Sequence, residues 1–235
     1  MRGRARVALV AAVGVAATTL ALAGCSEGMG GPTGSGEVSI SDDGVTQAYL
    51  LVEGGADRLE ISADADDGTL VDVAGTDTNK PPSSESIDVD ADVDEALAVR
   101  ADGGTIEVHV SPTSSWTIEI EAGTETFVAD FTDATLDRLA IKNGSSDGTI
   151  RLSTPDAVVP IEQTAGFSSL TLEVESGTPV RWTTSAGAGE IDFLGDVTEG
   201  AEAGLELTSD AFDESQPYVD LRSSAGLGKL TVSDE

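Results

Sequence analysis

The sequence predicts an all-β fold made of repeated strand units, arranged as a solenoid-like stack or as a twisted β-meander. Apolar and polar residues alternate along most of the chain, Gly-containing pairs typical of tight turns separate the alternating runs, and one strand–corner–strand pattern recurs. Beyond residue 36, no stretch of ten or more residues has a helical period, and residues 132–139 come nearest to one. A β-sandwich whose hairpins match by chance is the alternative fold.

The first 24 residues have the pattern of an export signal. Arginines at positions 2, 4 and 6 precede an apolar run, Val7 to Leu22, which is shorter than the roughly 20 apolar residues of a membrane-spanning helix. The run ends in Leu22-Ala23-Gly24-Cys25, which resembles the lipobox of bacterial lipoproteins. This resemblance implies cleavage between Gly24 and Cys25 and a diacylglycerol on the Cys25 thiol. In the alternative, Cys25 follows a non-lipidated signal by chance.

A flexible tether over residues 25–36 and a β-strand-repeat domain over residues 37–235 complete the predicted organisation. Residues 26–36 read SEGMGGPTGSG, and such Gly- and Ser-rich sequence behaves as a flexible coil. Acyl chains on Cys25 would hold the domain at the extracytoplasmic face of the cell membrane. Cys25 is the only cysteine, so no disulfide within the chain can support the fold.

The net charge limits the partners that the chain can bind. Without the three arginines of the signal, nine Lys and Arg residues face 43 Asp and Glu residues, which gives a formal charge of −34. This charge excludes nucleic acid as a partner, because phosphate binding needs clustered Lys and Arg. It also disfavours electrostatic docking on anionic lipid, so the acyl chains must provide the attachment to the membrane.

Short alternating runs predict strands, each with one buried face, along nearly the whole domain. The runs begin at Leu59, Leu70, Ile87, Leu97, Ile106, Ile118, Leu139, Ile150 and Leu170. Residues that tolerate the positive φ of tight turns lie between several of these runs. These turn candidates are Asp67-Gly68, Asp102-Gly103-Gly104, Asn143-Gly144 and Asp147-Gly148.

An internal repeat is the strongest signal in the sequence. One unit has apolar residues at 159, 161, 170 and 172 and an Ala-Gly pair at 165–166, and it recurs 21 residues later and then a further 39 residues on. The three units begin at Val159, Val180 and Val219, and a weaker copy begins at Leu139. Stacked copies of such a unit would share one continuous apolar core. Leu205 and Leu207 could supply an extra rung inside the 39-residue gap.

The glycines of the repeat are expected at structural corners. Gly166, Gly187 and Gly226 each follow an alanine between the two apolar halves of a unit. Glycine can take dihedral angles closed to other residues there and lets two backbones approach each other.

The texture of the repeats resembles the putative-adhesin, toast-rack-like β-strand-repeat family of bacterial envelope proteins. Residues 219–232, VDLRSSAGLGKLTV, carry the resemblance most clearly, and it extends over roughly residues 45–232. It implies an exported or membrane-linked all-β protein of a family whose members mostly have no known biochemical activity. An adhesin-like role is what the resemblance implies, and no single residue encodes it.

The sequence assembles no recognisable catalytic or metal site. His109 is the only histidine, and it alternates with apolar residues of one strand, so its side chain is expected to point away from the core. The chain has no Gly-x-Ser-x-Gly motif for a serine nucleophile. A zinc site is disfavoured because no second histidine is present and Cys25 would carry lipid. We therefore predict no catalytic residue and no cofactor.

The alternating aspartates over residues 88–94 resemble the start of a calcium-binding loop. An EF-hand loop needs Gly at its sixth position and Glu at its twelfth, and those positions here are Val93 and Val99. We therefore predict a strand with a solvated acidic face. Asp64 to Gly68 looks similar and is read as a turn, so no metal site is expected.

Taken together, these features favour a lipid-anchored, non-catalytic surface module with an adhesin-like binding role. Its partners would be the membrane, through the diacylglycerol on Cys25, and an unknown envelope protein or polysaccharide. An envelope-stress sensor or regulator that works with a membrane partner is one alternative. A polysaccharide-active enzyme is the other, but carboxylates are too abundant in this chain to single out a catalytic pair, and aromatic residues for a sugar platform are few.

Overall fold

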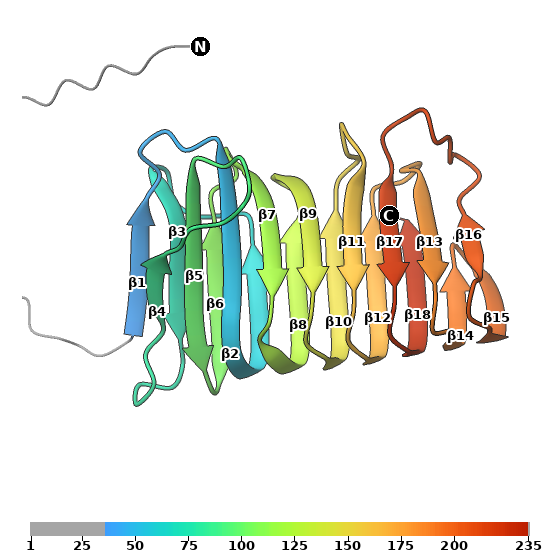
Figure 1. Ribbon diagram of the computed structural model, residues 1–235, viewed down its shortest axis with the longest axis horizontal. Helices are drawn as coiled ribbons and strands as arrows, with labels where there is room; N and C mark the ends of the chain where they lie inside the picture. Colours follow the sequence, from blue (N-terminus) through green and yellow to red (C-terminus); the bar gives the residue numbers. More distant parts are fainter. Residues whose placement is uncertain (1–35, 235) are drawn as a thin grey trace, which may run out of the picture. The chain divides into compact units, whose positions relative to one another are not determined.

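The computed structural model describes residues 36–234, and these residues contain eighteen β-strands and no helix (Figure 1). The predicted all-β class is confirmed. The expected signal peptide, Cys25 and nearly all of the expected tether lie outside the described residues. The strands are β1 Gly36–Ser41, β2 Gln47–Ser62, β3 Thr69–Gly75, β4 Ser83–Ser86, β5 Glu95–Asp102, β6 Thr105–Val110, β7 Ser115–Ile120, β8 Gly123–Phe131, β9 Thr135–Ile141, β10 Ser145–Leu152, β11 Val159–Gln163, β12 Phe167–Val174, β13 Val180–Thr184, β14 Ala188–Phe193, β15 Asp196–Ala201, β16 Glu206–Thr208, β17 Val219–Ser223 and β18 Leu227–Asp234.

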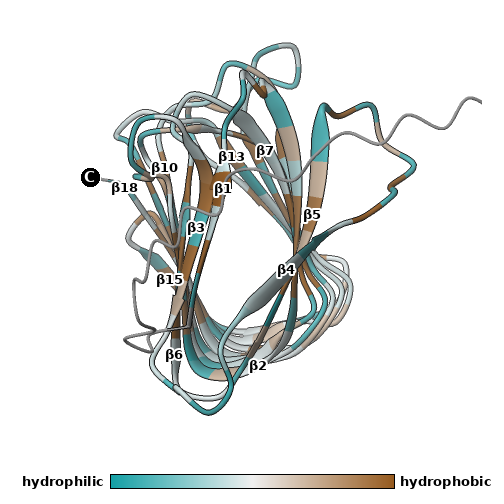
Figure 2. Cartoon of the chain, turned by 90° about the vertical axis from the view of Figure 1, so that its left-hand side faces the viewer, coloured by the Kyte–Doolittle hydropathy of each residue, from teal (hydrophilic) through white to brown (hydrophobic). Residues whose placement is uncertain are grey.

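The strands form one mixed sheet that does not close, and its pairings follow two ladders joined through the long strand β2. Ladder A runs β4, β5, the first half of β2, β7, β9, β11, β17, β13 and β16. Ladder B runs β1, β3, β6, the second half of β2, β8, β10, β12, β18, β14 and β15. Figure 2 looks along the stack and shows the two ladders facing each other.

Each rung of the stack has one strand in each ladder, and a corner joins the two strands. The predicted register of the repeat is confirmed, because Val159 and Val180 both pair in parallel with Val219. The second halves of the units match in the same way: Leu170 and Ile191 both pair with Leu230. Side chains of one face therefore stack directly above one another, and this gives the single elongated core that the alternation predicts.

The order of the rungs in space differs from their order in the chain. The last rung, β17 and β18, lies between the rung of β11 and β12 and the rung of β13 and β14. At the other end of the chain, β2 lies between the rung of β5 and β6 and the rung of β7 and β8. Strand β2 and the last rung are thus each inserted between two rungs that follow one another in the chain.

The expected extra rung around Leu205 and Leu207 is present, but its strands run antiparallel to those of the unit before it. The residues that follow β14 turn back as β15 and β16, which pair antiparallel with β14 and β13. Leu205 and Leu207 are partly buried against the core and so close its end. The 39-residue spacing holds this antiparallel cap, and the next unit then returns to the interior of the stack.

Both tryptophans lie in the core with no exposed surface, and both indole nitrogens are satisfied. Trp116 Nε1 donates to the carbonyl oxygen of Ser111 at 2.9 Å, and Trp182 Nε1 donates to Ser223 Oγ at 3.0 Å. The second bond joins the rung of β13 to the inserted strand β17. A buried indole without a partner for its N–H would cost about 1–3 kcal/mol.

Two of the four predicted turns have the positive φ that the sequence implied, at Gly68 and at Gly103-Gly104. Asn143-Gly144 lies at the corner between β9 and β10, without a positive φ at Gly144. The prediction for Asp147-Gly148 is wrong, because both residues lie inside β10. A Cβ on Gly148 would come within 2.6 Å of the Phe167 ring, so this glycine clears space for an aromatic side chain.

The three repeat glycines all lie between the two strands of a rung, but their surroundings differ. Gly187 has φ +88°, and a Cβ there would lie 2.5 Å from the carbonyl oxygen of Ala201. A Cβ on Gly166 would only touch the carbonyl oxygen of Gly226, at 3.7 Å, and one on Gly226 would meet nothing within 4 Å. A need for glycine is therefore evident at Gly187, where the cap approaches the corner.

Candidate functional site

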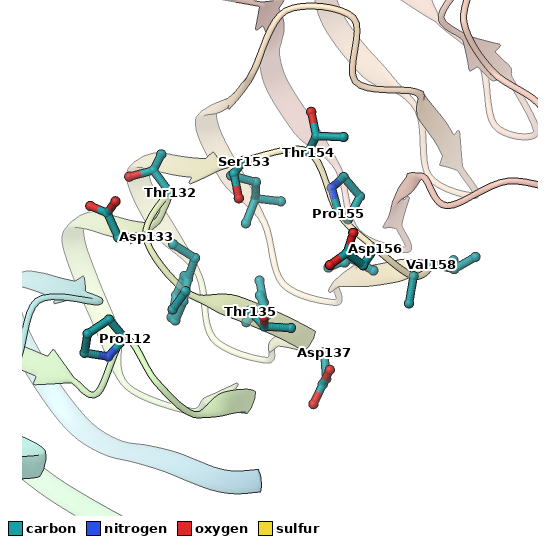
Figure 3. Close-up of a pocket in the computed structure, with 16 residues that line it drawn as sticks. Pro112, Thr132, Asp133, Thr135, Asp137, Ser153, Thr154, Pro155, Asp156 and Val158 are labelled. Carbon is teal, nitrogen blue, oxygen red and sulfur yellow. The ribbon is translucent and has the colours of Figure 1, made fainter. Parts of the chain in front are cut away.

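An open cleft lies where successive rungs are connected (Figure 3). Its walls are the turn between β8 and β9 and the segment between β10 and β11, and its volume is about 440 Å³. Figure 3 shows Thr132, Asp133, Ser153 and Asp156 around the hollow. Sequence reasoning missed this cleft, because its walls come from two turns that are about 20 residues apart and carry no shared motif.

The cleft combines apolar residues with a polar, acidic rim. Phe131, Leu136, Leu152 and Val159 line it and are nearly buried, whereas the side chains at the rim are exposed. Three carboxylates, Asp133, Asp137 and Asp156, line the cleft together with four hydroxyl groups, and no Lys or Arg does so. Such a surface can accept hydrogen bonds from several donors at once and attracts cationic groups.

The turn on one side of the cleft is held by a carboxylate. Asp130 Oδ1 accepts hydrogen bonds from the Thr132 backbone N–H at 3.2 Å and from Thr132 Oγ1 at 2.7 Å. On the other side, the backbone N–H of Thr154 donates to Glu175 Oε2 at 3.2 Å, and the hydroxyls of Thr154 and Thr178 are 2.9 Å apart. These bonds connect the walls of the cleft to the rungs beneath.

His109 points away from the core, as its alternation predicts, and it meets two polar side chains of β2 and the following loop. Its Nδ1 lies 3.1 Å from Ser62 Oγ and 2.7 Å from Asp64 Oδ1, and Ser62 Oγ donates to the same Asp64 oxygen at 2.5 Å. A Ser-His-Asp triad needs the serine on one ring nitrogen and the carboxylate on the other. Here both contact Nδ1, so the arrangement does not have the geometry of a triad.

The cluster of Ser62, Asp64 and His109 is partly exposed, and its contacts lower the pKa of Asp64. Burial raises the pKa of Asp64, but hydrogen bonds from Ser62 and His109 and the nearby imidazole lower it by more, so that it lies below its usual value. We interpret the cluster as a polar bridge between β2 and β6.

The prediction of a strand for the aspartates at 88–94 is wrong, because these residues form an irregular loop between β4 and β5. The last of them has a local role: Asp94 Oδ2 accepts hydrogen bonds from the backbone N–H and hydroxyl of Thr46, at 2.9 and 2.8 Å, and from the N–H of Gln47. These bonds lower the pKa of Asp94 and fix the start of β2. Within residues 36–234, no three His, Cys, Asp or Glu side chains are placed to hold a metal ion.

The scarce basic residues are almost all used within the stack. Eight of the nine Lys and Arg residues beyond the expected signal form ion pairs with acidic side chains in the described part of the chain. The pairs are Arg58–Glu60, Arg100–Glu53, Arg138–Glu162, Lys142–Glu119, Arg151–Glu173, Arg181–Asp220, Arg222–Asp220 and Lys229–Glu190. The remaining carboxylates therefore dominate the surface offered to a partner.

One acidic member of these ion pairs, Asp220, is buried and contacts two arginines. The Asp220 side chain has no exposed surface; Arg181 Nε and Nη2 donate to its two oxygens at 2.9 and 3.0 Å, and Arg222 Nε donates at 2.7 Å. The Arg181 guanidinium also lies over the rings of Phe212 and Tyr218, 5.8 and 5.1 Å from their centroids. Burial raises the pKa of Asp220, but the hydrogen bonds from the two arginines lower it by more, so that it lies below its usual value.

The expected lipidation site at Cys25 and the cleavage site after Gly24 lie outside the described residues. In residues 36–234, no helix is present that is long and apolar enough to cross a membrane. The corner glycines lie among the rungs, away from the cleft lining.

Comparison with known proteins identifies the fold. The structure is similar to a crystal structure of a "putative cell adhesion protein" from Clostridium sporogenes, with a TM-score of 0.63. The two sequences are 16% identical, and the match covers 85% of this chain and 98% of the other. No family model matches the chain, and no curated protein matches it. At this level of identity the similarity concerns the architecture.

Proposed function

We propose that this chain is a lipid-anchored, extracytoplasmic, non-catalytic module that binds a partner at the cell surface or in the envelope. The structural neighbour bears the name of a cell adhesion protein, and the same architecture supports an adhesin-like role here. The expected signal, lipobox and tether support anchoring at the outer face of the cell membrane. The anchor rests on sequence alone, as does the assignment to the envelope.

The open acidic cleft is the observation that carries the binding role. Its apolar lining can cover part of a ligand, and its rim offers carboxylates and hydroxyls without any basic side chain. These properties favour a partner that presents amines, guanidinium groups or hydroxyls. Both an envelope protein and a polysaccharide can present such groups.

Anchoring is tested by replacing the lipidated residue. We expect Cys25→Ala to move the protein from the membrane fraction to the soluble fraction, because the chain beyond the signal is too acidic to bind anionic lipid by charge. The measurement is an immunoblot of separated fractions. A variant that still sediments with membranes after a high-salt wash would disprove the lipid anchor.

Binding is tested with the soluble Cys25→Ala protein on isolated envelopes. The triple variant Asp133→Asn, Asp137→Asn, Asp156→Asn should bind at least tenfold less, because it removes the charges around the cleft. The matched control is Asp88→Asn, Asp90→Asn, Asp92→Asn, which removes the same charge from an exposed loop and should bind like the parent protein. Equal binding by the two triple variants would exclude the cleft as the binding site.

A further inference from the structure

The two ladders leave four strands with a free edge in the described residues: β1 and β4 at one end, and β15 and β16 at the other. A free edge presents unpaired N–H and C=O groups, and natural sheets usually protect it with charge, proline or a short strand. Three of these edges are protected in this way. β4 has four residues and follows Pro81-Pro82, and β16 has three residues.

The edge strand β15 is protected by charge. It carries two carboxylates, Asp196 and Glu199, and no basic residue. Asp196 lies opposite the inward-facing Phe193, at the end of the core. The two acidic side chains of this short edge strand disfavour the addition of another strand.

The edge strand β1 has the weakest protection of the four. It has six residues, GEVSIS, with no proline, no basic residue and a single carboxylate, Glu37. Val38 and Ile40 point inward and are only partly buried, and Glu37, Ser39 and Ser41 point outward and are exposed. Among the described residues its sole partner is β3.

β1 also extends beyond the opposite ladder. Past the rung of β5 and β6, ladder B continues with β3 and β1, whereas ladder A continues with β4 alone. Figure 2 shows this end, with β1 and β3 on one side and β4 and β5 on the other. A hollow of about 340 Å³ lies beside β1, lined in part by Ile40, Val45 and Leu97. The inner face of β1 therefore has incomplete apolar cover.

We propose that β1 is a self-association edge, which pairs antiparallel with β1 of a second copy of this chain about a twofold axis at Ser39. The strand is self-complementary in this register. Val38 then lies opposite Ile40 of the other copy, twice by symmetry, so that the apolar inner face continues across the junction. Glu37 lies opposite Ser41, so no two carboxylates of the strands face each other.

Alternative registers fit less well. A twofold axis at Ile40 would place Val38 opposite Asp42 and Glu37 opposite Asp43, which sets an apolar side chain against a carboxylate and opposes two acids. A twofold axis at Val38 would place Gly36 opposite Ile40, so the larger apolar side chain would have no apolar partner. The register centred on Ser39 pairs residues 37–41 and gives both apolar side chains an apolar partner.

The size of the paired contact and the net charge of the chain determine how strongly two copies associate. Five paired residues on each strand make a smaller contact than the 1,200–2,000 Å² of a typical stable interface, so association is weak in dilute solution. The formal charge of −34 opposes it over a distance that salt shortens to about 8 Å at physiological ionic strength. Self-association should therefore increase with added salt, and it does not depend on the lipid anchor.

The test uses the chain without its signal and with Cys25→Ala, which removes the only thiol. In this background, Ser39→Cys places two thiols on the twofold axis, where the Cα separation of about 4.5–5.5 Å suits a disulfide. The matched control is Ser41→Cys, whose copies lie about 13 Å apart along the paired strands. Under mild oxidation at high protein concentration, we expect Ser39→Cys to give at least fivefold more covalent dimer than Ser41→Cys.

A charge test probes the same register without oxidation. Ser39→Lys sets two lysines opposite each other and should weaken association at least threefold, whereas Ser41→Lys sets Lys opposite Glu37 of the other copy and should strengthen it. Sedimentation equilibrium measures both, and melting curves confirm that the variants are folded. Equal cross-linking at positions 39 and 41, or a monomer at every concentration and salt level, would overturn the proposal.

Discussion

The middle rungs and the last rung of the stack are built from the same unit but are held differently. In the middle, β7 to β12 follow each other in space as they do in the chain, and half-exposed ion pairs such as Arg151–Glu173 cross their outer faces. The last rung, β17 and β18, is inserted between two earlier ones, and its outer face carries the buried Asp220 between two arginines. A repeat protein can therefore have its most buried ion pair in the rung whose place in space departs from the order of the chain.

The inserted rung differs from the end of an ordinary solenoid in what depends on it. Removing the terminal unit of a linear stack loses one interface, because each repeat contacts only its neighbours. The last rung here has a neighbour on each side. It therefore connects the body of the stack to the rung of β13 and β14 and, through that rung, to the cap of β15 and β16.

Removal of the inserted rung should have the largest effect on the stability of the protein. We expect a chain that ends at Gln216 to lose its cooperative thermal transition, because five core side chains between Val219 and Val232 leave the core. At about 2 kcal/mol each they contribute roughly 10 kcal/mol, comparable with the total stability of a domain. A chain that ends at Val232 is the control and should melt near the parent temperature. A folded Gln216 variant would show that the cap holds without the insertion.

Removal of one charge from each kind of ion pair, buried and half-exposed, should change the free energy of unfolding by different amounts. Asp220→Asn should destabilise the protein by roughly 3 kcal/mol, because it leaves two arginines beside a buried neutral side chain. Glu173→Gln removes the partner of Arg151 in a middle rung, where both side chains are partly exposed, and should cost less than about 1 kcal/mol. Denaturant unfolding measures both changes. Similar costs would mean that burial of Asp220 adds nothing to its pair.

Corners offer a second pair of equivalent positions. Gly187→Ala should cost about 1–3 kcal/mol, because the residue has φ +88° and its new Cβ would lie 2.5 Å from a backbone oxygen. Gly226→Ala in the inserted rung should stay within about 0.5 kcal/mol, since a Cβ there meets nothing within 4 Å. Melting temperatures distinguish the two, and equal shifts would show that the cap does not restrict the Gly187 corner.

Acid should weaken the inserted rung through Asp220. Its pKa in the folded protein lies below the usual 3.8, so its carboxylate contributes stability above that pH and loses the contribution as pH falls through the folded pKa. The difference in unfolding free energy between the parent protein and Asp220→Asn should therefore shrink below pH 3.8. The measurement is denaturant unfolding of both proteins between pH 7 and pH 3. A difference that grows in acid would contradict the sign of this shift.

Much of this fold could be predicted because side-chain alternation and strand pairing have the same period. The match of Val159, Val180 and Val219 follows from the spacing alone, and so does the burial of Trp182. The spatial order of the rungs could not be predicted, since equivalent units offer equivalent edges and the sequence does not state which unit lies next to which. The cap is equally hidden, because Leu205 and Leu207 alternate as a rung would.

Local patterns misled where tertiary packing decides. Gly148 follows an aspartate as a turn glycine does, yet it lies in a strand because the Phe167 ring occupies the space of a side chain. The aspartates at 88–94 alternate with apolar residues but have no neighbouring strand on which to pair. The acidic cleft is made by two turns of separate rungs, so its residues share no local motif.

The inserted rung also affects how the newly made polypeptide can fold. Synthesis delivers the N-terminal residues first, and domains generally begin to fold in that direction. Here the strands β13 to β16 are finished before β17 and β18, yet they cannot attach to the body of the stack until the sixteen residues from Val219 to Asp234 have joined them. The apolar ends of both parts therefore stay uncovered until β17 and β18 have been synthesised, which makes the docking of this rung the stage most exposed to misassembly.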